Sequence, residues 1–212
     1  MYLLHPSSIG KIMAEPTKKA KDAGEILSVG ALTYCEDIAH EIALDFRKEL
    51  KMKPIQKGLE CEDDSIALLN LVNFQNYKKH VGRVKTDLFS GECDILTDDY
   101  IRDIKTSWSR ETFPALKSRA MTPLYEMQLR CYMLIYDRPK AYLDFCLVNT
   151  PYKLCEYESP KLHYVDDLDP RMRVTTCMIL RDAEIESDMI KKATAAQLKI
   201  EEFLQQIEID HT

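Results

Sequence analysis

The sequence predicts a single α/β domain in which a mixed central β-sheet is flanked by helices and followed by a long C-terminal helix. The chain has 212 residues, 45% hydrophobic and 30% charged, which is typical of one globular domain. Helical periodicity dominates both ends of the sequence, whereas short apolar and β-branched runs occupy the middle around one inserted helix. No internal repeat or linker divides the chain, so we expect residues 1–212 to form one domain.

Helices are expected in the first third of the chain. The first is short and begins at a serine cap, either Ser7 or Ser8, because serine side chains accept hydrogen bonds from the free amides of a helix start. The polar, lysine-rich residues 15–27 predict a mobile loop. Longer helices are predicted at residues 32–50 and, after Pro54, at 57–74.

The predicted sheet begins after these helices. Residues 77–90 are expected to hold a first strand, and the next two strands form a hairpin around a polar turn at residues 97–99. A loop with a short helix and then an apolar helix should follow. The predicted hairpin strands are 92–96 and 100–106, the apolar helix is 124–136, the later strands are 141–148, a pair within 152–165, and 173–180, and the last helix starts at 181.

The hairpin carries the strongest chemical signal. Asp103 and Lys105 are two apart in a strand and therefore point to one face, while Ile104 points into apolar packing. The hairpin partner could bring Asp94 beside them. Carboxylate oxygens suit a hard divalent cation such as Mg²⁺, and a neighbouring ammonium could orient water or stabilise charge on a phosphate. An ordinary solvated acidic hairpin is the alternative interpretation.

Composition narrows the possible functions. The net charge of −6 argues against a surface that attracts nucleic acid everywhere, but it leaves room for a local basic groove. Seven dispersed cysteines without a C-x-x-C pair predict reduced thiols rather than disulfides or a zinc site. No apolar run approaches the ~20 residues of a membrane span. The basic clusters are Lys18, Lys19, Lys21; Lys78, Lys79, Arg83, Lys85; and Lys105, Arg110, Lys117, Arg119, Arg130.

The segment GECDILTDDYIRDIKTS resembles the core of the PD-(D/E)XK nuclease superfamily, and the whole chain resembles its YqaJ-type and lambda-type viral recombination exonucleases. The match consists of Asp94 followed by Asp103-Ile104-Lys105. The resemblance implies a restriction-endonuclease-like core. It also implies that the two aspartates and the Ile104 carbonyl bind metal, and that Lys105 acts beside the attacking water. Cys93 stands where the family has proline, and Asp103 where glutamate is commoner.

Three further segments extend the resemblance. The opening serine helix matches at Ser8, which would contact a DNA phosphate. A Gly-x-x-x-Glu helix matches at Glu62, with Glu60 as the alternative, and that glutamate would join the metal site. A Gln-x-x-x-Tyr helix matches at Gln128 and Tyr132, which would line the site. The candidate phosphate-binding residues are Ser8, Lys11, Arg110 and Arg130.

The resemblance implies a Mg²⁺-dependent exonuclease, with Mn²⁺ as a substitute, that digests linear double-stranded DNA 5′→3′ in phage-type recombination or repair. Expected partners are a single-strand annealing protein and further copies of the chain in a ring. No association with a membrane is expected. The expected location is the cytoplasm, that of a bacterial host if the chain is phage-encoded. The alternatives are an endonuclease of the same fold, a non-catalytic DNA-binding module on a nuclease core, and an unrelated α/β protein.

Overall fold

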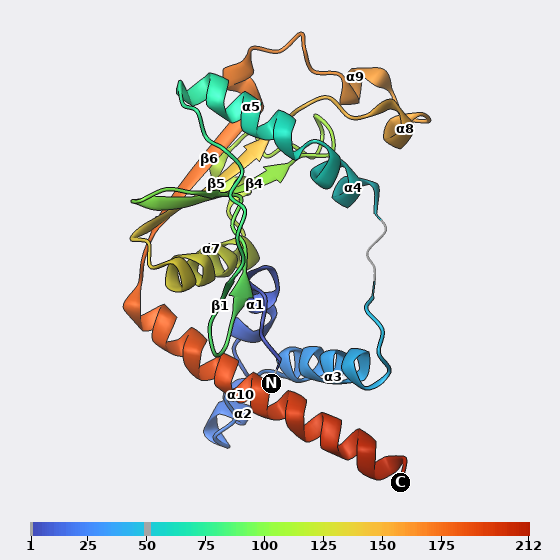
Figure 1. The fold of residues 1–212 in the computed structure, drawn as a ribbon, viewed down its shortest axis with the longest axis vertical. Coiled ribbons are helices and arrows are strands. Elements are labelled where there is room, and N and C mark those ends of the chain that lie inside the picture. The colour runs from blue at the N-terminus through green and yellow to red at the C-terminus, as the bar shows by residue number, and fades with distance from the viewer. Residues whose placement is uncertain (1, 49–51) are drawn as a thin grey trace.

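The computed structural model, which describes residues 2–48 and 52–212, contains a four-stranded mixed sheet in its upper half as drawn in Figure 1. The strands lie in the order β3, β4, β5, β6, with β4 and β5 parallel and the two outer pairs antiparallel. The expected mixed α/β class with helices on the sheet is confirmed. The strands are β3 (Ile95–Leu96), β4 (Tyr100–Thr106), β5 (Lys140–Cys146) and β6 (Val174–Leu180).

Two helices cover the two faces of this sheet. Helix α7 (Pro123–Tyr136) forms the crossover that two parallel strands require, and it packs on Ile101 and Leu143. Helix α5 (Glu62–Asn73) packs on the opposite face, against Ile104. Successive residues of β4 therefore point alternately toward α7 and toward α5.

A second, helical core lies on the far side of α7. It joins α1 (Pro6–Met13), α3 (Val29–Ala43) and α10 (Ala183–Asp210), and Figure 1 shows α10 passing below α7 to lie beside α3. At Gly10 of α1 a Cβ atom would stand 2.7 Å from the Leu124 side chain, so glycine allows α1 and α7 to approach closely.

Short elements connect these layers. They are α2 (Lys18–Asp22), α4 (Lys53–Glu60), β1 (Val84–Lys85), β2 (Ser90–Gly91), α6 (Lys117–Ala120), α8 (Tyr152–Cys155), α9 (Pro160–His163) and the 3₁₀ helix η1 (Pro170–Arg173). Strands β1 and β2 pair with each other and not with the central sheet, so the strand expected within 77–90 forms a small separate ribbon, whose Ser90 amide also donates to the Leu4 carbonyl at 2.9 Å. Within the described ranges, no helix combines the length and the hydropathy needed to cross a bilayer.

Several predicted elements were wrong. The strand pair expected within 152–165 is replaced by α8 and α9, because Pro151 and Pro160 stand where a helical turn begins and their fixed φ favours that turn. The helix expected at 57–74 is two helices, since the backbone of Cys61 leaves helical geometry (φ −110°, ψ 19°) between α4 and α5.

The N-terminal helices also differ from the prediction in their ends. Helix α1 has His5 as its N-cap and Pro6 in its first turn, so neither predicted serine caps it. Helix α3 begins at Val29 because Ser28 accepts a hydrogen bond from the Ala31 amide, and it ends at Ala43. The last predicted residues of that helix, 49–50, lie outside the described residues. The expected loop 15–27 contains α2.

Candidate active site

Three side chains form a closed cluster between β4 and α7. The Lys105 ammonium lies 2.6 Å from Asp103 Oδ2. Gln128 Nε2 donates to Asp103 Oδ1 at 3.0 Å, and Lys105 Nζ donates to Gln128 Oε1 at 3.3 Å. Asp103 is only 2% exposed and Gln128 only 6%, so both are fixed inside the protein. The structure therefore brings together the strand motif and the glutamine that the sequence singled out.

Asp94 lies at the open edge of β4. Strand β3 pairs with β4 only as far as Arg102, so the next edge amide, that of Ile104, has no strand partner there. Asp94 Oδ2 accepts a hydrogen bond from this amide at 2.5 Å. The amide and carbonyl of one strand residue point to the same side. The Ile104 carbonyl therefore faces the side on which Asp94 lies.

The charges of this cluster strongly influence one another. Burial, and then the like charge of Asp103, raise the pKa of Asp94 from its ordinary 3.8 to about 7. Burial by itself would lower the pKa of Lys105, but Asp103 and Asp94 outweigh it and the pKa is raised. The site therefore holds more negative charge than its own lysine neutralises, which favours a cation.

Removing the charge of Asp94 is expected to stabilise the metal-free protein against unfolding. The folded-state pKa lies above the unfolded one, so wild-type stability falls as pH rises from about 4 to about 7, by a few kcal/mol in all. Asparagine keeps the acceptor for the Ile104 amide but never ionises. In thermal unfolding with EDTA, the midpoint temperature of Asp94→Asn should exceed that of wild type by more at pH 8 than at pH 5. An equal gain at both pH values, or a loss at pH 8, would contradict this.

The oxygen atoms at the edge of β4 fit a hard divalent cation. Asp103 Oδ2 is buried and makes no hydrogen bond, because Lys105 is close to it but not aligned for one. The Asp94 carboxylate and the Ile104 carbonyl supply further oxygens of the type that Mg²⁺ prefers. In residues 2–48 and 52–212, no three acidic, histidine or cysteine side chains form a metal-binding group by themselves. A cation here would thus use the backbone carbonyl and water as well.

The predicted upstream acid, Glu62, forms an ion pair outside this cluster. Glu62 opens α5, and its Oε2 lies 2.6 Å from the ammonium of Lys79. It still acts on the cluster through its charge, since it contributes to the raised pKa of Asp94. The alternative, Glu60, instead pairs with Lys153 at 3.0 Å. The structure therefore associates Glu62, rather than Glu60, with the cluster.

Tyr132 supports the cluster from one turn further along α7. Its hydroxyl donates to the Glu92 carbonyl at 2.9 Å, which fixes the backbone two residues before Asp94. Burial raises the pKa of this hydroxyl, so it remains a donor at all ordinary pH values. Its contact is with the backbone rather than with the acidic side chains.

A charged pair on the other face of the sheet was missed in the sequence. Arg102 donates to both oxygens of Asp144, at 2.7 and 2.8 Å, and stacks over Tyr142. Thr176 donates to the same carboxylate at 2.6 Å. The sequence does contain a signal for this pair. Arg102 is two residues from Ile104 and so shares its buried strand face, where an arginine needs an acidic partner. The pair ties β4 to β5 behind the cluster.

A second missed residue is Lys57 of α4, which is fully buried. Its ammonium donates to three backbone carbonyls, those of Ser107 at 2.8 Å, Trp108 at 3.0 Å and Val148 at 2.8 Å. Burial lowers its pKa to about 8. The first two carbonyls directly follow β4, so Lys57 fixes the chain just beyond Lys105.

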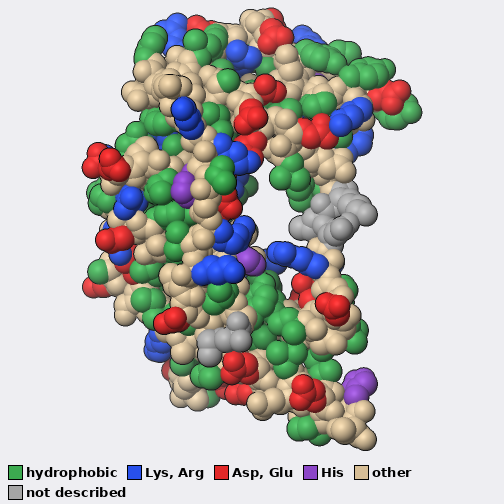
Figure 2. Space-filling view, viewed as in Figure 1, with side chains coloured by type: hydrophobic (Ala, Val, Ile, Leu, Met, Phe, Trp, Pro, Cys, Tyr) green, Lys and Arg blue, Asp and Glu red, His purple; other side chains and the backbone are tan. Residues whose placement is uncertain are grey.

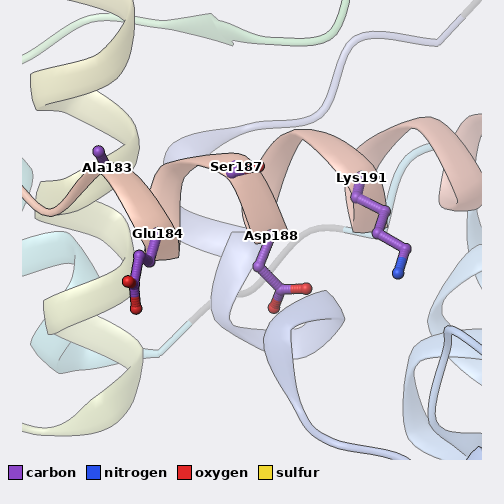
Figure 3. Close-up of a pocket in the computed structure, with 5 residues that line it drawn as sticks. All are labelled: Ala183, Glu184, Ser187, Asp188 and Lys191. Atoms are coloured by element: carbon purple, nitrogen blue, oxygen red, sulfur yellow. The ribbon is translucent and has the colours of Figure 1, made fainter.

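The predicted phosphate-binding residues lie in three places. Lys11 of α1 stacks over the ring of Tyr34, 4.7 Å from its centroid, and Ser8 lies on the same helix. Arg110 pairs with Asp167 and with the Tyr164 carbonyl, and Arg130 pairs with Glu126. Both arginines would have to exchange a carboxylate for a phosphate. A surface pocket along α10 contains none of the candidates; Ala183, Glu184, Ser187, Asp188 and Lys191 line it (Figure 3).

The chain is similar in structure to solved exonucleases. A phage-related exonuclease from Haemophilus somnus 129PT superposes with a TM-score of 0.90 at 28% identity, over 97% of this chain and 96% of that one. The alkaline exonuclease LHK-Exo from Laribacter hongkongensis gives 0.70 at 15% identity, over 99% and 93%. Its complex with dAMP also gives 0.70, at 16% identity and the same coverage. No protein-family model and no curated protein matches the sequence.

Proposed function

We propose that this protein, which has the fold of a phage-related exonuclease, is a metal-dependent exonuclease of the PD-(D/E)XK type acting on linear duplex DNA. The observation that carries the proposal is the cluster of Asp103, Lys105 and Gln128 beside Asp94, at the open edge of a strand in that fold. The same edge offers the Ile104 carbonyl.

Asp94, Asp103 and the Ile104 carbonyl would hold Mg²⁺, or Mn²⁺ in its place, with Glu62 available from the start of α5. The cation supplies Lewis-acid stabilisation of the charge that develops on phosphate oxygens. Gln128 fixes Asp103 by donating to its Oδ1. The other oxygen, Oδ2, is ion-paired with Lys105 but accepts no hydrogen bond, and it would be the oxygen that Asp103 shares with the cation.

Lys105 provides the only ammonium that this cluster contains among the described residues. Its raised pKa keeps it charged at neutral pH. In that state it donates a hydrogen bond to an attacking water or to a phosphate oxygen, and it stabilises negative charge as the phosphodiester reacts. Asp103 and Gln128 hold the ammonium in place, so it needs no reorganisation during the step.

The DNA backbone would be bound by basic side chains. Figure 2 shows Lys and Arg side chains gathered along the middle of the drawn face, although the chain as a whole carries a net charge of −6. Neutralised phosphates release counterions, so affinity for DNA should fall as salt increases. The proposal includes 5′→3′ polarity, a homo-oligomeric ring and a single-strand annealing partner in phage-type recombination.

Digestion of linear and circular DNA tests the reaction. With Mg²⁺, the protein should release mononucleotides from the 5′ ends of a 5′-phosphorylated linear duplex and leave a covalently closed circle intact. Strand-specific end labels report the polarity. A circle that is nicked or linearised would favour the endonuclease alternative, and an intact linear duplex would contradict nuclease activity.

A further inference from the structure

The ion pair between Lys79 and Glu62 connects the edge of the candidate site to the basic segment 78–85. The Lys79 ammonium lies 2.6 Å from Glu62 Oε2; the Glu62 side chain is 19% exposed and that of Lys79 is 48% exposed. The next residue, His80, donates its backbone amide to the Asp94 carbonyl at 2.7 Å. Lys79 is therefore held next to the backbone of a candidate metal ligand by a short, fixed connection.

Glu62 has two competing uses in this position. It belongs to an acidic helix start with Asp63 and Asp64, and its charge acts on the half-buried Asp94. In the structure, however, its Oε2 is bonded to Lys79. A lysine that is half in solvent forms a weak pair, because water competes for both charges. A divalent cation can therefore displace it.

We propose that Lys79 is a positioning residue for the metal site, which binds the Glu62 carboxylate in the metal-free protein and releases it when a divalent cation binds at Asp94 and Asp103. This inference rests on the proposed function. The released ammonium is exposed beside the site and becomes free to pair with a DNA phosphate, so cation binding and DNA binding are coupled.

Calorimetric titration of the full chain with Mn²⁺, without DNA, tests this competition. Lys79→Met keeps the length of the side chain and removes its charge, so it should bind Mn²⁺ about three- to fivefold more tightly than wild type. Lys78→Met is the matched control, since Lys78 is an exposed neighbour with no ion pair to a described residue. Its affinity for Mn²⁺ should stay within about twofold of wild type.

The variant Glu62→Gln separates release of Glu62 from a general effect of charge. Glu62→Gln should weaken Mn²⁺ binding, and adding Lys79→Met to it should change nothing further, because the pair no longer exists. If Lys79→Met tightens binding equally with and without Glu62, the charge acts through space and the inference is overturned.

The same titrations distinguish failure of this inference from failure of the proposed function. Wild-type protein that binds Mn²⁺ as tightly as Lys79→Met would overturn the role of Lys79 and leave the metal site standing. Wild-type protein that binds no Mn²⁺ would contradict the metal site, and the role of Lys79 with it. Circular dichroism of each variant establishes that it is folded before titration.

Discussion

Replacing Lys105 by methionine is expected to lower the rate of nucleotide release from linear duplex DNA by about a thousandfold. Methionine retains the length of the side chain but removes the charge that contacts Asp103 Oδ2 and donates to Gln128. The attacking water and the developing phosphate charge then lose their cationic partner. The initial rate with saturating Mg²⁺ measures this effect.

A distant lysine provides the matched control for this variant. Lys199 of α10 has a side chain that is 41% exposed and pairs only with Glu202 among the described residues, so Lys199→Met should cleave at the wild-type rate. Lys105→Met should also keep the circular dichroism spectrum of the wild type. A Lys105→Met rate within threefold of wild type would remove this residue from the catalytic account.

Replacing Lys57 by methionine is expected to lower the free energy of unfolding by about 3–5 kcal/mol. The methionine fills the same buried space, but the carbonyls of Ser107, Trp108 and Val148 lose the ammonium that donates to all three. The carbonyls of Ser107 and Val148 then lose their side-chain donor and a large part of their hydration energy, whereas the Trp108 carbonyl still accepts from the Thr150 hydroxyl at 3.1 Å. Urea unfolding monitored by fluorescence of Trp108, the single tryptophan, measures the change.

Lys153→Met serves as the control for Lys57→Met. Its ammonium pairs with Glu60 at 3.0 Å, and its side chain is 69% exposed. The expected change in unfolding free energy is within about 0.5 kcal/mol. An equally small change for Lys57→Met would show that the three carbonyls do not depend on the buried ammonium.

Elements with strong local periodicity could be predicted from the sequence. Alternation in β4 places Asp103 and Lys105 on one face, and long apolar stripes identify α7 and α10. The segment 152–165 was predicted wrongly because its residues favour strands locally. Pro151 and Pro160 instead stand where the helical turns of α8 and α9 begin. The bonds from His163 to Thr150 and Glu158 hold the segment in that form.

The contacts of the candidate site also fall into those that a local sequence pattern predicts and those that it does not. The relation between Asp103, Ile104 and Lys105 follows from a period of two along a strand. The hydrogen bonds of Lys57 instead connect residues 50 or more positions apart, and the contact of Glu62 with Lys79 depends on where α5 begins. Such contacts arise only when the chain is folded, and no local pattern encodes them.

Release of acid-soluble nucleotides from a 5′-phosphorylated linear duplex, by wild type and by Asp103→Asn in parallel, tests the central claim most directly. Wild type with Mg²⁺ should digest the DNA, EDTA should stop it, and Asp103→Asn should release nucleotides at least a hundredfold more slowly, by about the factor that one lost charge-stabilising group costs. Digestion that continues in EDTA would contradict a metal-dependent active site at the edge of β4. Digestion by Asp103→Asn at the wild-type rate would contradict it as well.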